Sequence, residues 1–184
     1  MSEVEVFVSN EGTQYIWHRG QEKIVKLTDE EVNLIGFKVR LMEDKEILNR
    51  QSGNGISMGI PIKLNKDRLK EIKDMLVTVL KSGPFIDIET HVIDRLVLDS
   101  LLDEEDPQKR GWEDEEDVKN CVLTAKKVVG VRLNVNHQHP ENTNKIKHLH
   151  PHLALVISGK KEDGSGRLVL VILNENTINV ITIL

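Results

Sequence analysis

Aromatic residues and cysteine are both scarce in this sequence, and each shortage limits the structures that it can form. Phe, Trp and Tyr make up 3% of the 184 residues, so a core must be built mainly from Val, Ile and Leu. β-Branched side chains suit the pleated surface of a sheet. Cys121 is the only cysteine, which excludes a disulfide within the chain and a metal site made of thiolates. We therefore expect a sheet-rich core without cross-links, which a chain of this length can bury.

An excess of positive charge and long apolar segments are also missing. The formal net charge is −5, and no stretch clusters the Lys and Arg residues that neutralise phosphates, so we expect no nucleic-acid partner. The longest apolar runs cover 153–157 and 168–173, far below the roughly 20 residues that span a bilayer. The first residues lack the basic and apolar regions of a signal peptide. We therefore expect a soluble, cytoplasmic protein that does not enter a membrane.

The first third of the chain begins with the pattern of a β-hairpin. Residues 3–8 alternate in polarity, Gly12 occupies a turn, and 14–19 form the returning strand. Thr28 and Glu31 then have the spacing of a capping box, which marks the start of a helix. The apolar residues that follow fit both a helix and a strand, and for 29–49 we favour a helix.

The middle of the chain predicts three helices. The first is capped by Asn65 and ended by Gly83, and the second follows Thr90. The third extends to about Val129, with acidic residues in its first turn and Gly130 beyond its end. Its apolar stripe consists of Val118, Cys121, Val122, Ala125 and Val129.

From Val131 onward the apolar residues repeat every second position, which is typical of strands. We predict strands at about 131–137, 149–158, 166–174 and 177–184. The sequence thus indicates one α+β domain, residues 1–184. It consists of an N-terminal β-hairpin and a mostly antiparallel C-terminal sheet, with helices from the middle of the chain packed on that sheet.

Five of the seven histidines lie in one short segment: His137, His139, His148, His150 and His152. Alternate residues of a strand lie about 6.5 Å apart on one face, so each cluster could bind one ion. If the two strands are antiparallel neighbours, both clusters meet at one sheet edge. Zinc or another divalent metal is the expected cofactor, and Glu141 is the nearest candidate for a general base. The alternative is that these histidines are solvated or structural.

The strand that ends in His137-x-His139-Pro140 resembles the H-x-H-P segment of JAB/MPN-type zinc metallopeptidases. The resemblance covers about twelve residues and implies that His137 and His139 ligate zinc. Glu89 would correspond to that family's glutamate. The Ser-x-x-Asp that follows the motif in that family is absent, so His148 would have to replace its acid.

The segment from His152 to Leu155 resembles half of a 2H phosphoesterase motif. That motif has a hydroxyl residue two positions after each histidine and occurs twice. Here Ala154 stands at the hydroxyl position and no second copy is present, so we set this resemblance aside.

Three other features have ordinary structural interpretations. The acidic run 103–117 reads as a solvated loop before a helix, and its Trp112 either anchors a partner or packs on the core. Cys121 lies on the apolar stripe of its helix, where an inert buried thiol is expected. The glycines in 53–59 fit neither a dinucleotide fingerprint nor a P-loop, so a flexible loop is the simpler interpretation.

Two functions therefore remain open, and whether the protein is an enzyme is undecided. The first is a divalent-metal-binding protein, including a metal-dependent hydrolase, that uses the C-terminal histidines. The second is a non-catalytic assembly or adaptor subunit that contacts a protein partner or a second copy. In that case the last strand, 177–184, would pair from a sheet edge, with Ile181 in the contact.

Overall fold

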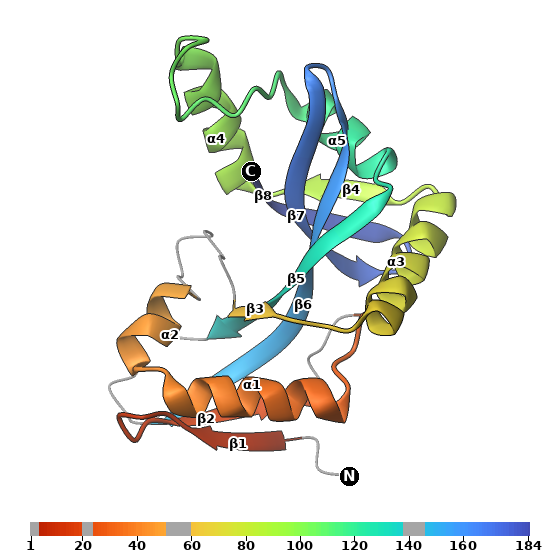
Figure 1. Cartoon of the computed structure of the whole chain (residues 1–184). Helices are drawn as coiled ribbons and strands as arrows, with labels where there is room; N and C mark the ends of the chain where they lie inside the picture. Colours follow the sequence, from red (N-terminus) through yellow and green to blue (C-terminus); the bar gives the residue numbers. More distant parts are fainter. Residues whose placement is uncertain (1–3, 20–23, 51–59, 138–145) are drawn as a thin grey trace. The chain divides into compact units, whose positions relative to one another are not determined.

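The computed structural model describes residues 4–19, 24–50, 60–137 and 146–184, with only the backbone described at 48–50, 60, 134–137 and 150. The chain forms two compact units. Unit 1 comprises residues 1–62 and 132–153, and unit 2 comprises residues 63–131 and 154–184. Two long strands, β5 (Lys127–His137) and β6 (Ile146–Lys161), contribute to both units (Figure 1). The prediction of one domain stays a prediction.

Unit 1 begins with the predicted hairpin. Strand β1 (Val4–Val8) pairs antiparallel with β2 (Gln14–His18), and Gly12 has the positive φ of 83° that the turn requires. The ambiguous segment is helical, as we favoured, but it forms two helices instead of one. Helix α1 (Asp29–Leu41) is capped by Thr28, whose hydroxyl accepts from the Glu31 N–H at 3.2 Å. Helix α2 (Asp44–Arg50) and strand β3 (Ile60–Ile62), which pairs with β5, follow.

Helix α1 packs along one face of the hairpin (Figure 1). Phe7, Tyr15 and Trp17 are buried on that face, and the rings of Phe7 and Trp17 meet edge to face with centroids 5.7 Å apart. The hydroxyls of Ser9, Thr13 and Tyr15 all donate to the carboxylate of Asp44. This network ties the hairpin turn to the start of α2.

Unit 2 is built on a sheet in the order β6-β7-β8-β4. Strands β6, β7 (Gly164–Asn174) and β8 (Thr177–Ile183) are antiparallel neighbours, and β4 (Phe85–Ile88) joins β8 in parallel. Its helices are α3 (Lys66–Lys81), α4 (Thr90–Leu101) and α5 (Glu115–Leu123), which come from the middle of the chain as expected. The α+β class is confirmed. None of the helices in the described ranges combines the length and the apolar character that crossing a membrane requires.

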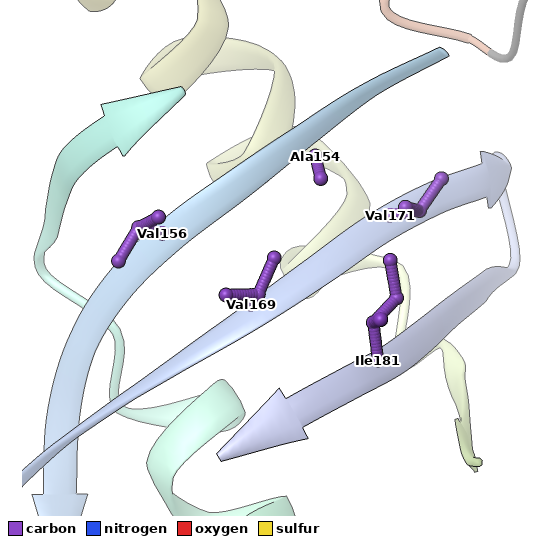
Figure 2. Packing of buried hydrophobic residues seen from close by; sticks show 5 residues of the cluster. All are labelled: Ala154, Val156, Val169, Val171 and Ile181. Carbon is purple, nitrogen blue, oxygen red and sulfur yellow. The ribbon is translucent and has the colours of Figure 1, made fainter. Parts of the chain in front are cut away.

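The central strands of unit 2 are buried on both faces, as the continuous apolar run in β7 predicts. Figure 2 shows one cluster, to which three neighbouring strands contribute: Ala154 and Val156 of β6, Val169 and Val171 of β7, and Ile181 of β8. Val156 and Val169 are directly opposed in the register. Burial of aliphatic side chains between these strands supplies the core that the scarcity of aromatics led us to expect.

Two boundary predictions were wrong. Helix α5 ends at Leu123 rather than near Val129, and β5 begins at Lys127. Hydrogen bonds to β6 account for the early end of the helix, because Thr124 Oγ1 accepts from the Lys160 N–H at 2.8 Å and the Lys126 N–H donates to the Ser158 carbonyl at 3.2 Å. Pairing with β6 therefore outweighs the helical spacing of the apolar residues after Thr124.

The last strand is not an edge strand. Strand β8 lies between β7 and β4, and Ile181 belongs to the buried cluster with 7% of its surface exposed. The assembly hypothesis therefore loses the contact that the sequence suggested for it.

Candidate functional site

Parallel pairing between β2 and the start of β6 brings together two histidines that are 130 positions apart in the sequence. In this register Ile16 lies opposite His148, and Trp17 lies opposite Leu149. His18, two residues beyond Ile16, shares the face of Ile16 because side chains alternate along a strand. Trp17 and Leu149 are buried on the α1 side, so the two imidazoles project from the opposite face of the sheet.

The two imidazole rings are in direct contact. Nε2 of His18 lies 2.8 Å from Nδ1 of His148, with ring centroids 5.1 Å apart and ring planes inclined by 25°. Such a hydrogen bond requires one nitrogen to carry a proton and the other to present its lone pair. The two nitrogen atoms therefore lie close enough together for one ion to contact both.

The end of β2 is held in place by the residue that follows His18. The guanidinium of Arg19 lies 2.9 Å from the Asp29 carboxylate and 3.7 Å from that of Glu5, and it donates to the Leu27 carbonyl at 3.3 Å. These contacts connect the strand end to the first turn of α1. They orient the backbone at His18, although each exposed ion pair contributes little stability by itself.

The structure describes the predicted histidines to different extents. His148 is exposed and belongs to the ring pair, whereas His152 has 7% of its surface exposed. His152 lies four positions further along the extended strand, about 13 Å from His148, so parallel side chains at these two positions cannot bind the same ion. His137 ends β5 and His150 lies within β6, and only their backbones are described. His139 and Glu141 lie outside the described residues, as does the glycine segment 53–59.

Sequence reasoning missed His18. It stands alone beside Trp17, with no second histidine within reach along the chain. Its alternation with the buried Tyr15 and Trp17 places it on the outward face, but the parallel pairing with β6 joins opposite ends of the sequence. No local pattern specifies that partner.

The structure does not support the resemblance to the metallopeptidases or the resemblance to the phosphoesterases. Glu89, the match for a catalytic glutamate, precedes α4 in unit 2 and accepts a hydrogen bond from the Asn179 amide at 2.6 Å. Ala154, at the hydroxyl position of the phosphoesterase motif, is fully buried in the core of unit 2.

Comparisons with protein-family models, with curated proteins and with solved structures find no match to this chain. Within the part of the chain that the structure describes, no three His, Cys, Asp or Glu side chains are grouped to hold a metal ion. The candidate site therefore consists of the pair formed by His18 and His148.

Cys121 is buried as predicted, and its thiol should be inert. It lies in α5 and contacts the Gly166 carbonyl at 3.4 Å. Burial raises the pKa of the Cys121 thiol to about 11, two units above its ordinary value, so at pH 8 the folded protein should hold about a hundredfold less thiolate than the unfolded chain. We expect a disulfide reagent to label native protein at least that much more slowly than protein in guanidinium chloride.

The raised pKa also predicts how stability depends on pH. The neutral thiol is favoured in the folded state, so its contribution is complete below the unfolded-state pKa and is lost as the pH rises from about 9 to 11. Replacing Cys121 with Ser should remove this alkaline loss. Equal labelling rates in native and unfolded protein would contradict the buried position.

Proposed function

We propose that this protein binds a divalent metal ion through His18 and His148. The observation that supports the proposal is the 2.8 Å separation of Nε2 and Nδ1 on adjacent parallel strands. Neutral imidazole is a common ligand for zinc and for other late first-row ions. A zinc ion bound to both nitrogens at about 2.0–2.1 Å would replace the shared proton, after a small rotation of the rings.

The proposal is limited to binding and does not extend to hydrolysis. No described carboxylate is grouped with the two rings, so the described residues supply no general base for a hydrolytic step at this pair. The hydrolase and the adaptor subunit remain predictions from the sequence. A zinc ion with two protein nitrogens keeps coordination positions for water or for other ligands.

The test is zinc binding by isothermal titration and metal analysis, on protein purified without a histidine tag or nickel resin. Wild-type protein should bind zinc, and His18→Ala and His148→Ala should each weaken binding by at least about tenfold. His91→Ala is the matched control, because His91 lies on α4 in unit 2, and it should bind as wild type does. Binding should also weaken as the pH falls, because protons compete with the ion for both rings.

Two results would contradict the proposal. One is the absence of bound zinc, copper, nickel, cobalt or manganese after incubation and desalting. The other is zinc binding that both single variants leave unchanged, which would assign the ion to other residues. Circular dichroism on each variant checks that the fold is intact.

A further inference from the structure

The sheet face that carries the histidine pair is apolar and open. Strand alternation and the register place Val6 and Val8 of β1 and Ile146 of β6 on the same side as the two rings. They expose 46%, 48% and 43% of their surfaces. The opposite face of the hairpin is covered by α1, so the two faces differ sharply in burial (Figure 1).

The paired residues that the structure describes on this face are uncharged side chains and the two imidazoles. Its rows in the register are Val8–Gln14–Ile146 and Val6–Ile16–His148, with Val4 opposite His18. Glu5 of β1 alternates onto the other face, where its carboxylate lies 3.7 Å from the guanidinium of Arg19. Although the chain has a net charge of −5, these described rows thus offer a surface without formal charge, which does not repel a second copy of itself.

We infer that the metal ion bridges two copies of this chain, which stack through this face. The inference rests on the proposed function. Two histidines are half of the four ligands that zinc takes in a closed tetrahedral site, and a two-fold axis through the ion supplies the same pair from the second copy. Sheets packed face to face lie about 10 Å apart, so an ion midway is about 5 Å from each backbone, within reach of an imidazole.

Stacking would also cover the exposed apolar side chains, which removes their contact with water. In an isologous contact Val6, Val8 and Ile146 of one copy meet the same patch of the other copy. A second copy of the chain therefore supplies the missing ligands of the ion and also covers the apolar patch.

The experiment measures molar mass and metal stoichiometry together, on tag-free full-length protein, by sedimentation with zinc and with EDTA. Zinc should double the mass and bind at one ion per two chains, and EDTA should restore the monomer. His148→Ala should abolish both effects. Ile146→Glu keeps both histidines and should bind zinc as a monomer. Leu101→Glu, at a 77% exposed position of α4, is the matched control and should dimerise normally.

The outcomes separate the two proposals. One ion per chain with no change in mass overturns the bridge and leaves the proposed function standing. The absence of any bound ion overturns both. A dimer that persists in EDTA also overturns the bridge. So does a dimer that is lost in Leu101→Glu and kept in Ile146→Glu.

Discussion

Replacing Asp99 with Asn is expected to destabilise the fold by about 3 kcal/mol at pH 7. The Asp99 side chain is fully buried on α4, and its carboxylate accepts the backbone N–H groups of Arg110, Gly111 and Trp112. Hydrogen bonds to a charged acceptor contribute about 1.5–3 kcal/mol each, and an orphaned buried donor costs about 1–3 kcal/mol. Asn keeps the size of the side chain, loses the charge and turns a donor toward these groups.

Denaturant unfolding measures this effect, and Asp94→Asn is the matched control on the exposed side of the same helix. Burial raises the pKa of the Asp99 carboxyl, but the three backbone donors outweigh burial and leave that pKa below its ordinary value. The stabilisation by Asp99 is therefore complete above the unfolded-state pKa and is lost as the pH falls through the folded-state pKa. The two variants should become equally stable in acid. Equal stability at pH 7 would contradict the anchoring role.

Asp99 explains why the acidic segment is not simply a solvated loop. Its carboxylate holds the turn before Trp112, whose indole Nε1 donates to the Leu184 carbonyl at 3.1 Å and whose ring stands 5.0 Å from the Lys161 ammonium. Trp112 has 3% of its surface exposed, so it pins the loop to the core, one of the two alternatives that the sequence offered. The sequence does contain a signal for Asp99, because Val92, Leu96 and Asp99 share one helical stripe.

Local patterns predicted most elements of the fold, and long-range pairing decided the rest. The caps Thr28 and Asn65 mark the starts of α1 and α3, because each satisfies a backbone donor within its own helix. The predicted boundary between α5 and β5 was wrong because hydrogen bonds with β6 outweigh the helical spacing of the apolar residues in that segment. The pairing of β8 with β4 was not predicted, since β4 comes about 90 residues earlier and no turn links the two strands.

The two residues of the candidate site also differ in whether the local sequence predicts them. His148 was found because it belongs to a cluster that is visible in the sequence. His18 was missed because its partner depends on a parallel pairing, which requires a long crossover that leaves no local mark. His148 and His152 alternate onto the same face of the strand, which suggested that they could bind one ion. They lie too far apart along the strand to do so.

Replacing Gly159 with Ala is expected to destabilise the fold by about 3 kcal/mol or more. A Cβ at this position of β6 would lie 2.0 Å from the Cys121 carbonyl oxygen and 2.8 Å from its carbon. These are backbone atoms of α5, so no side-chain rotation can relieve the clash, and the helix must move away from the sheet. Overpacking of a filled core costs about 1–3 kcal/mol, and more when the backbone has to shift.

Gly130→Ala is the matched control, since Gly130 is also a strand glycine of unit 2. The nearest atoms to its added Cβ belong to Val156 at 3.7 Å, an ordinary contact. That variant should be neutral or more stable by about 0.4–1 kcal/mol, because Ala restricts the unfolded chain. Thermal and denaturant unfolding should therefore separate the two variants, and Cys121 should react faster with a disulfide reagent only in Gly159→Ala. Equal stability of the two variants would mean that α5 does not rest on the backbone of β6, and the inert character of Cys121 would then lose its structural explanation.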